Sequence, residues 1–288
     1  MTDLMIIGKS GQLGAELINF CKKTKTDFVA FGSHTLNITD YIKVNETIGK
    51  IKPKIIINTA AFHVVPLCEK YPTQAFIVNS LAIGNLAKVA KKYNSKLVTF
   101  STDYVFDGKK GKPYLETDSP NPLQVYGQSK LAGEQAALTV YPEGVYIIRT
   151  CGVYGGKSGS KSKKGNFVLT ILKDAKAPWT LEISSEQIVN PTYAKHLAKA
   201  TVGLLDLNPS PGVYHLTNEG SMSWYEFAKE IINYARLKNK IVPIDRKGKD
   251  GKIRRPEYSA LANTKAKKLG IVLPSIEDGL KEYLAEIL

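Results

Sequence analysis

Short apolar runs alternate with amphipathic segments along the first half of this 288-residue chain. The amphipathic segments carry apolar side chains at the three- and four-residue spacing of a helix, and turn-forming residues separate them from many of the runs. The pattern predicts strands at residues 4–7, 28–31, 55–57, 97–100 and 145–148, with the clearest helices at 74–91 and 130–138. Strands that alternate with helices form βαβ units, so we expect an α/β fold with a doubly wound parallel sheet.

The alternation of apolar runs and amphipathic segments becomes less regular after Thr150. The second half predicts helices at 167–175 and 194–205 and strands at 181–183 and 213–216. Ser223 and Glu226 have the spacing of a capping box, which predicts a helix that runs to about Leu237.

This change of pattern indicates two domains. Residues 1–150 would form the sheet domain, and residues 151–288 would form mainly a smaller C-terminal α/β lobe that binds the substrate. Some segments, for example those around 190–217, are expected to return to the first domain.

Cysteine content and hydropathy narrow the class of protein. The three cysteines, Cys21, Cys68 and Cys151, lie far apart and show no spacing typical of a zinc site, which favours a reducing compartment. The N-terminus lacks the parts of a signal peptide, and no segment approaches the ~20 apolar residues of a membrane span. We therefore expect a cytoplasmic protein with no membrane partner.

The formal net charge of +14 makes a nucleic acid one partner to consider. Much of the excess lies in two Gly/Lys-rich stretches, 155–165 and 246–255, which carry no interleaved aromatic residues. Solvated loops are one interpretation, and a positive rim around a cleft that binds a diphosphate is the other. We expect no nucleic-acid partner.

A glycine turn follows the first strand. Gly8, Gly11 and Gly14 lie between strand and helix, where they would allow a tight turn, close approach of a pyrophosphate and close helix packing, respectively. The helix N-terminus would face the phosphates with unpaired N–H groups. This arrangement predicts a Rossmann-type fold that binds NADPH or NADH.

The end of the second strand carries no acidic residue that would select NADH. Ser33, with His34 or Lys9, could instead contact a 2′-phosphate, although His34 could equally be a plain surface residue. After the third strand, the small side chains of Ala60 and Ala61 would leave room for the nicotinamide ribose, or would serve helix packing. Asn79 is either an amide that holds a helix open or an ordinary surface residue.

The chemistry is expected at Tyr126 and Lys130. Their i, i+4 spacing places both side chains on one face of a helix, where an ammonium would lower the pKa of the phenol and make it a general acid. Thr102 follows another strand, where it could bind the reacting oxygen or could cap the next turn.

These segments together resemble the extended short-chain dehydrogenase/reductases and, within them, the dTDP-4-dehydrorhamnose reductases. The resemblance covers essentially the whole chain and is most specific at Ser101-Thr-Asp-Tyr-Val-Phe-Asp-Gly108. The other matching segments are the glycine turn, 58–61, 126–134, Arg149-Thr150, Asn190-Pro-Thr192 and Arg255-Pro-Glu-Tyr-Ser259. The resemblance implies reduction of the C4 ketone of dTDP-4-dehydro-β-L-rhamnose by NADPH or NADH.

The resemblance also implies residue roles. Tyr126 would donate the proton to the C4 oxygen, Lys130 would bind the nicotinamide ribose, and Arg255 would bind the diphosphate. The remaining substrate contacts would be Thr102, Asp103, Tyr104 and Asn166. The cofactor contacts would be Gly8, Gly11, Gln12, Leu13, Gly14, Ser33, Asn37, Ile38, Ala60, Ala61, Asn79, Ser101, Tyr126 and Lys130.

The chain departs from the family pattern at several positions. Cys151 and Gly152 stand where the family commonly has a tryptophan over the sugar, so we expect a less enclosed floor. Asn37 stands where an aspartate would usually contact adenine. Glu16 matches a glutamate that bridges a metal-linked dimer in some relatives, but the other ligands cannot be placed, so we expect no metal and leave a homodimer open.

Three alternatives stay open. The enzyme could reduce another nucleotide-linked 4-keto-6-deoxy sugar, including one on a UDP carrier. The chain could be a non-catalytic NADP-binding subunit that resembles the regulatory subunit of methionine adenosyltransferase. A nucleic-acid-binding relative is suggested by charge alone.

Overall fold

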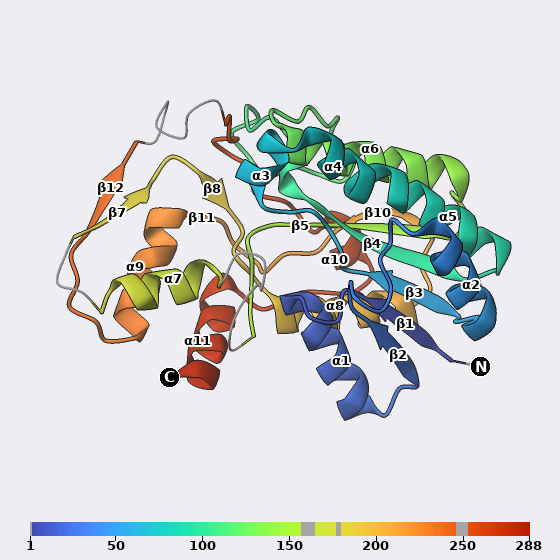
Figure 1. Ribbon diagram of the computed structural model, residues 1–288. Coiled ribbons are helices and arrows are strands. Elements are labelled where there is room, and N and C mark those ends of the chain that lie inside the picture. Colours follow the sequence, from blue (N-terminus) through green and yellow to red (C-terminus); the bar gives the residue numbers. More distant parts are fainter. Residues whose placement is uncertain (1, 157–164, 177–179, 246–252) are drawn as a thin grey trace.

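The computed structural model describes residues 2–156, 165–176, 180–245 and 253–288 (Figure 1). Its centre is a six-stranded parallel sheet in the order β10-β5-β4-β3-β1-β2. The strands are β1 (Leu4–Ile7), β2 (Phe28–Phe31), β3 (Ile55–Asn58), β4 (Lys96–Thr102), β5 (Val145–Thr150) and β10 (Gly212–His215). The predicted parallel α/β sheet is confirmed, since every one of these runs was expected from its apolar pattern.

Helices cover both faces of the sheet (Figure 1). One face packs against α1 (Gln12–Thr24), α8 (Ala194–Asp206) and α10 (Thr264–Lys268), and the other against α2 (Tyr41–Ile51), α5 (Ala82–Lys92) and α6 (Val125–Val140). Strand β1 shows why both faces must be covered: Leu4 and Ile6 belong to the first core and Met5 and Ile7 to the second. The carboxyl ends of the strands therefore form the edge left for ligands.

The continuous helix expected at 74–91 is wrong in detail. The segment consists of α4 (Pro72–Phe76), a π-helical turn η1 (Ile77–Leu81) and α5, preceded by α3 (Val65–Lys70). Asn79 lies in the π turn, is 1% exposed and bonds to other segments, so it is not a surface residue. Single π turns of this kind are frequent at functional sites.

A smaller lobe has its own aromatic core, built around Tyr154, Tyr193, Phe227 and Tyr283. It contains α7 (Phe167–Asp174), α9 (Trp224–Tyr234) and α11 (Ile276–Ile287). Its strand pairs are β7 (Leu181–Ser184) with β12 (Ile241–Ile244), β8 (Ile188–Val189) with β11 (Met222–Ser223), and β6 (Val153–Tyr154) with β9 (Thr192–Tyr193). The predicted capping box of Ser223 and Glu226 is confirmed, although its helix ends at Tyr234.

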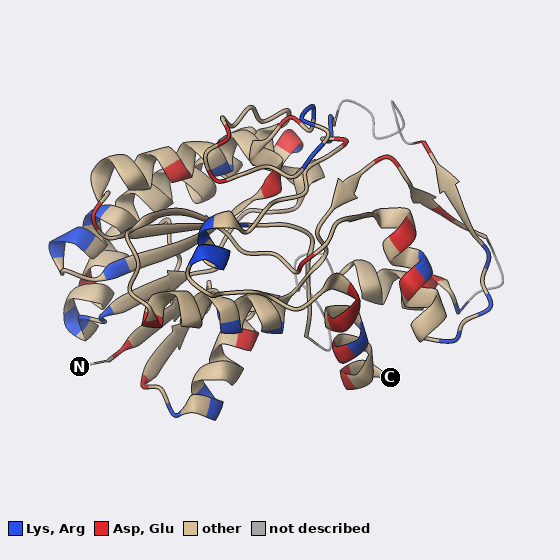
Figure 2. Cartoon of the chain, turned by 180° about the vertical axis from the view of Figure 1, so that it is seen from behind, with Lys and Arg blue, Asp and Glu red and all other residues tan. Residues whose placement is uncertain are grey.

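The Lys and Arg residues in the described part of the chain are spread over several helices and loops (Figure 2). Most of the two Gly/Lys-rich stretches, at 157–164 and 246–252, falls outside the described residues. Among the described helices, none combines the length and apolarity that a membrane crossing requires.

Candidate active site

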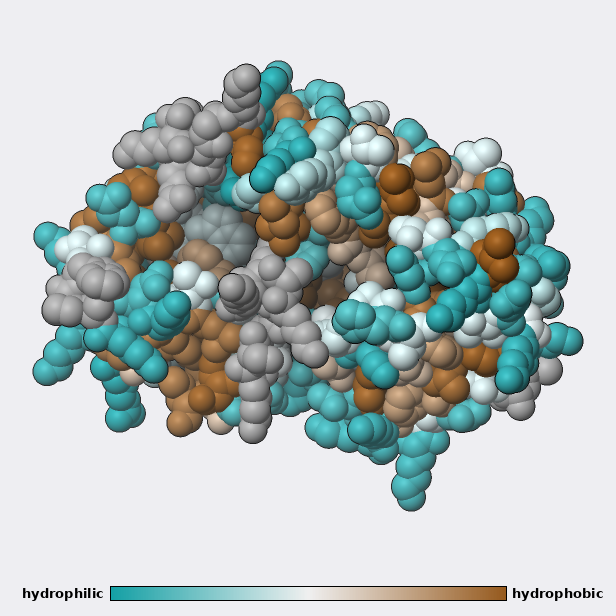
Figure 3. Space-filling model, in the orientation of Figure 1, coloured by the Kyte–Doolittle hydropathy of each residue, from teal (hydrophilic) through white to brown (hydrophobic). Residues whose placement is uncertain are grey.

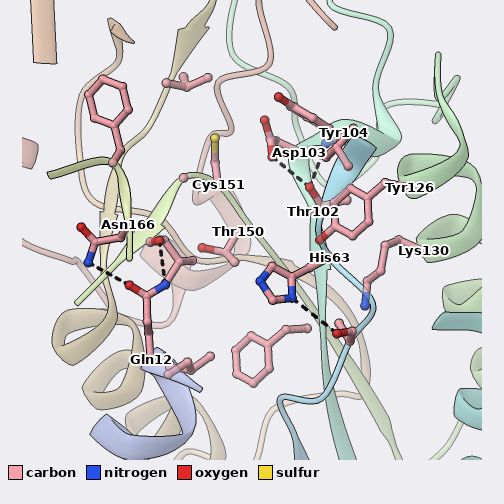
Figure 4. A pocket seen from close by; sticks show the side chains of 18 of the residues that line it. Gln12, His63, Thr102, Asp103, Tyr104, Tyr126, Lys130, Thr150, Cys151 and Asn166 are labelled. Carbon is pink, nitrogen blue, oxygen red and sulfur yellow. Dashed lines mark hydrogen bonds between the residues drawn. The ribbon is translucent and has the colours of Figure 1, made fainter. Parts of the chain in front are cut away.

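A cavity of about 650 Å³ lies between the carboxyl ends of the sheet strands and the small lobe. The surface drawn in Figure 3 is hollowed between these two parts. The predicted site residues that line this cavity are Gly11, Gln12, Leu13, Ala60, Ala61, Ser101, Thr102, Asp103, Tyr104, Tyr126, Lys130, Asn166 and Arg255. Residues that are far apart in the sequence are thus brought to one cavity (Figure 4).

The glycine turn is tightly packed. Gly8 has φ +94°, and a Cβ there would lie 2.4 Å from Thr59 Oγ1. A Cβ on Gly14 would lie 2.3 Å from the Gly8 carbonyl oxygen. The tight turn and the close helix packing expected for these glycines are therefore confirmed. Gly11 is the N-cap residue of α1. Because glycine has no side chain that could accept a capping bond, the N–H groups at the helix N-terminus stay open to the cavity.

Replacing Gly14 by Ala is expected to weaken NADPH binding about tenfold or more and to lower the melting temperature. The added methyl group would push α1 away from the turn, and such overpacking costs about 1–3 kcal/mol. A fluorescence titration with NADPH and a thermal melt measure both effects. Gly203→Ala is the matched control, because no atom lies within 4 Å of a Cβ at that helix position. Equal NADPH affinity in the two variants would contradict the role assigned to Gly14.

Gln12 lies at the start of α1 and bridges toward the small lobe. Its Nε2 donates to the Val153 carbonyl at 3.3 Å, and its Oε1 accepts from Asn166 Nδ2 at 3.0 Å. Asn166 also caps α7 by accepting from Leu169 N at 3.0 Å. These two predicted ligand contacts therefore also join the sheet domain to the lobe.

Tyr126 and Lys130 lie one turn apart near the start of α6 and both face the cavity (Figure 4). Thr102, at the end of β4, lies beside them (Figure 4). Its Oγ1 donates to Asp103 Oδ1 at 3.0 Å and accepts from Tyr104 N at 3.1 Å. Thr102 therefore caps the short η2 turn (Asp103–Val105), as one interpretation expected, and also lines the cavity.

The expected lowering of the Tyr126 pKa is wrong for this structure. Burial raises the pKa of the Tyr126 phenol above its usual range, and a hydrogen bond with Thr102 opposes this only in part. Burial lowers the pKa of Lys130 to about 8, although the Glu134 carboxylate favours its charged form. Tyr126 is thus a protonated phenol at neutral pH, which is the form that a proton donor requires.

Asn79 does not line the cavity but fixes the segments that do. Its Oδ1 accepts from Phe62 N at 2.8 Å, and its Nδ2 donates to Phe62 O at 2.8 Å and to Ser129 Oγ at 3.0 Å. Ser129 lies on α6 between Tyr126 and Lys130. Asn79 therefore ties the loop after β3 to the helix that carries both residues.

Asp103, Tyr104 and Arg255 meet directly beside Thr102 and Tyr126. Asp103 accepts from Ser259 Oγ at 2.6 Å, and burial raises the pKa of its carboxyl group. Arg255 Nη1 donates to the Tyr104 hydroxyl at 3.2 Å, and the Tyr104 ring stands edge-on to that of Tyr126 at 6.3 Å. A guanidinium group is thus placed beside the cavity.

Three predicted cofactor contacts at the end of β2 lie away from the cavity lining. Ser33 and Asn37 are exposed, with Asn37 Oδ1 accepting from Thr39 N at 3.1 Å, and Ile38 is buried in the core beneath. His34 is exposed as well.

The structure also adds lining residues that the sequence did not indicate, among them His63, Thr150, Phe167, Gln187 and Trp224. The expected open floor at Cys151 and Gly152 is also corrected, because Trp224 of α9 reaches Gly152. Only the place of Thr150 at the carboxyl end of β5 could have indicated any of these.

No group of three or more His, Cys, Asp or Glu side chains in the described part of the chain has the arrangement of a metal site. Glu16 instead lies with Lys195 and Glu286 at a separate surface depression. Lys195 forms ion pairs with Glu282 and Glu286 at 2.6 Å each.

The family model described as "RmlD substrate binding domain" matches residues 1–288. The chain is 37% identical to the spore coat polysaccharide biosynthesis protein SpsK of Bacillus subtilis, over 99% of this chain and 98% of that protein. It is 34% identical to dTDP-4-dehydrorhamnose reductase of Escherichia coli over the same shares. A crystal structure of dTDP-4-dehydrorhamnose reductase from Bacillus anthracis in complex with NADP superposes with a TM-score of 0.93, at 34% identity, covering 99% of this chain and 100% of that one. With its glycine turn and its Thr102, Tyr126 and Lys130 at one cavity, the chain belongs to the dTDP-4-dehydrorhamnose reductase family.

Proposed function

We propose that this protein is an NADPH- or NADH-dependent oxidoreductase that reduces the C4 ketone of dTDP-4-dehydro-β-L-rhamnose to give dTDP-L-rhamnose. The observation that carries the proposal is the meeting of Thr102, Tyr126 and Lys130 at the cavity that the glycine turn also lines. The E. coli relative and the NADP-bound structure support the same substrate and cofactor.

Residues of the sheet domain would hold the cofactor, which supplies the hydride when bound. The open N-terminus of α1 offers N–H groups to a pyrophosphate at Gly11, Gln12 and Leu13. Ala60 and Ala61 leave room at the nicotinamide end, and Lys130 would bind the ribose. The close packing at Gly8 and Gly14 fits this use, because it leaves the turn compact beneath the phosphates.

Tyr126 would complete the reduction as the proton donor. The protonated phenol gives its proton to the C4 oxygen as negative charge develops there, and the Thr102 hydroxyl stabilises the same oxygen. Asp103, Tyr104 and Asn166 would orient the sugar, and Arg255 would bind the diphosphate with its planar fork of N–H donors. In this proposal residues 1–150 bind mainly cofactor and residues 151–288 mainly substrate.

The compartment and the assembly are part of the proposal. Cys21, Cys68 and Cys151 are buried thiols that form no disulfide, which supports a reducing cytoplasmic compartment. A homodimer is compatible with the fold and would be tested by light scattering.

NADPH and NADH oxidation with an enzymatically generated substrate tests the function. The substrate is made from dTDP-glucose by a dehydratase and an epimerase, and the loss of reduced cofactor is followed by absorbance. Omitting the epimerase offers the unepimerised 4-keto-6-deoxy sugar as the matched control substrate. Turnover that depends on both helper enzymes supports the proposal, and binding of NADPH without any turnover contradicts it.

The kcat/KM for NADPH is expected to fall as the pH rises through about 8. The Lys130 pKa of about 8 means that its ammonium group, which would bind the ribose, loses its proton in that range. A pH profile of initial rates between neutrality and mild alkali measures the effect. Lys130→Arg keeps the charge, so its residual activity should lose this alkaline limb. An unchanged limb in that variant would assign the titration to another group.

A further inference from the structure

The lobe side of the cavity carries two neighbouring aromatic rings. The Phe167 and Trp224 centroids lie 4.6 Å apart with their planes at 45°, and both residues line the cavity. Both are only half-buried, while the Phe227 ring behind them is fully buried at 5.9 and 6.3 Å from their centroids. We call Phe167 and Trp224 the aromatic wall.

Each ring of the wall is the first residue of a capped helix. Asn166 caps α7 directly before Phe167 and is itself held by Gln12 Oε1 at 3.0 Å. Ser223 caps α9 directly before Trp224, and its Oγ accepts from Glu226 N at 3.0 Å. Because both helix starts are fixed by side-chain bonds, the aromatic wall is held in place relative to the cavity.

Trp224 reaches across to the strand ends at Gly152. A Cβ on Gly152 would lie 3.0 Å from Trp224 Cη2, and Gly152 has φ +54°. Both the close contact and the backbone conformation therefore favour glycine at this position. The preceding residue, Cys151, shares a hydrogen bond with Asp103, which accepts from Thr102. The edge of the indole is therefore linked to Thr102, where the sugar would react, through Gly152, Cys151 and Asp103.

We propose, on the basis of the function given above, that the aromatic wall packs against the apolar face of the substrate's 6-deoxy pyranose ring and sets the specificity for the sugar. A 6-deoxyhexose presents C–H bonds and a methyl group, which aromatic rings cover well. With its C4 oxygen at Thr102 and Tyr126, the ring would lie along Cys151 and Gly152, where Trp224 closes the cavity. The diphosphate would lie at Arg255 and the nucleobase beyond it.

Tryptophan fluorescence tests this assignment without relying on turnover. The chain has two tryptophans, so Trp179→Phe leaves Trp224 as the one remaining tryptophan, which is excited selectively at a wavelength that tyrosine does not absorb. This protein, saturated with NADP, is titrated with dTDP-L-rhamnose and with dTDP. Emission should change with dTDP-L-rhamnose and stay constant with dTDP. An equal change with dTDP would assign Trp224 to the nucleotide, and no change with either ligand at saturation would remove it from the substrate site.

Kinetics separate the wall from the function itself. Trp224→Leu is expected to raise KM for the keto sugar about tenfold or more, the usual size of a lost apolar contact in a pocket. Trp224→Phe should recover most of that loss, and NADPH affinity should be unchanged in both. Tyr225→Leu, the next residue of α9 and not part of the cavity lining, is the matched control for helix damage. An unchanged KM in Trp224→Leu overturns the wall alone, whereas an inactive wild type overturns the proposed function.

Discussion

Tyr126→Phe should reduce kcat by about 10²–10⁴-fold while NADPH still binds with nearly its normal affinity. The variant removes one oxygen, and with it the proton donor, from a ring that otherwise keeps its place on α6. Burial raises the pKa of the Tyr126 phenol, so the wild-type hydroxyl is protonated over the whole neutral range. The loss of kcat should therefore be similar at every pH in that range. Steady-state rates and an NADPH titration on the same preparation measure the two properties.

Tyr104→Phe is the matched control for Tyr126→Phe, because the two rings stand edge to face in the same cavity. It removes the acceptor of the Arg255 bond and should act mainly on KM for the nucleotide-sugar. Equal losses of kcat in the two variants would show that Tyr126 is not the specific proton donor.

Glu134→Leu should lower the free energy of unfolding by about 3–5 kcal/mol. Arg149 binds this carboxylate through Nε at 3.0 and 3.2 Å and through Nη2 at 2.6 Å, and both side chains are 4% exposed. Removal of one partner leaves an uncompensated charge inside the protein, which is far costlier than the loss of an exposed ion pair. Urea unfolding followed by circular dichroism gives the difference.

The double variant Glu134→Leu/Arg149→Met should recover most of that stability, because it removes the Arg149 charge that Glu134→Leu alone leaves buried without its partner. Lys267→Ala, which breaks the half-exposed pair with Glu219, serves as the control and should change the stability by less than about 1 kcal/mol. A double variant no more stable than Glu134→Leu would mean that packing, and not charge, dominates at this position.

Much of the sheet domain can be predicted from the sequence because its signals are local. Strand β1 is buried on both faces and reads as an unbroken apolar run. Two features of the glycine turn are also local: Gly8 has a positive φ, and Gly14 packs against the Gly8 carbonyl oxygen. Tyr126 and Lys130 are likewise recognisable because their relation is a helical spacing.

The rest depends on contacts between distant segments, which no local pattern records. Asn79 lies in a π turn, and its amide bonds to Phe62 and Ser129, 17 and 50 residues away. Trp224 closes the cavity at Gly152 across two lobes, so the floor expected from Cys151 and Gly152 alone was too open. The pKa of Tyr126 follows burial, which the spacing to Lys130 does not reveal.

The triple bonding of Asn79 limits which substitutions evolution can accept at this position. One short side chain must present an acceptor to Phe62 N and donors to both Phe62 O and Ser129 Oγ. Aspartate lacks the donors, glutamine is a methylene too long, and serine or alanine leaves buried partners unsatisfied. Substitutions at Asn79 should therefore be rare, even though this residue does not line the cavity. Homologues should retain the asparagine for as long as they retain the tyrosine and lysine on the adjoining helix.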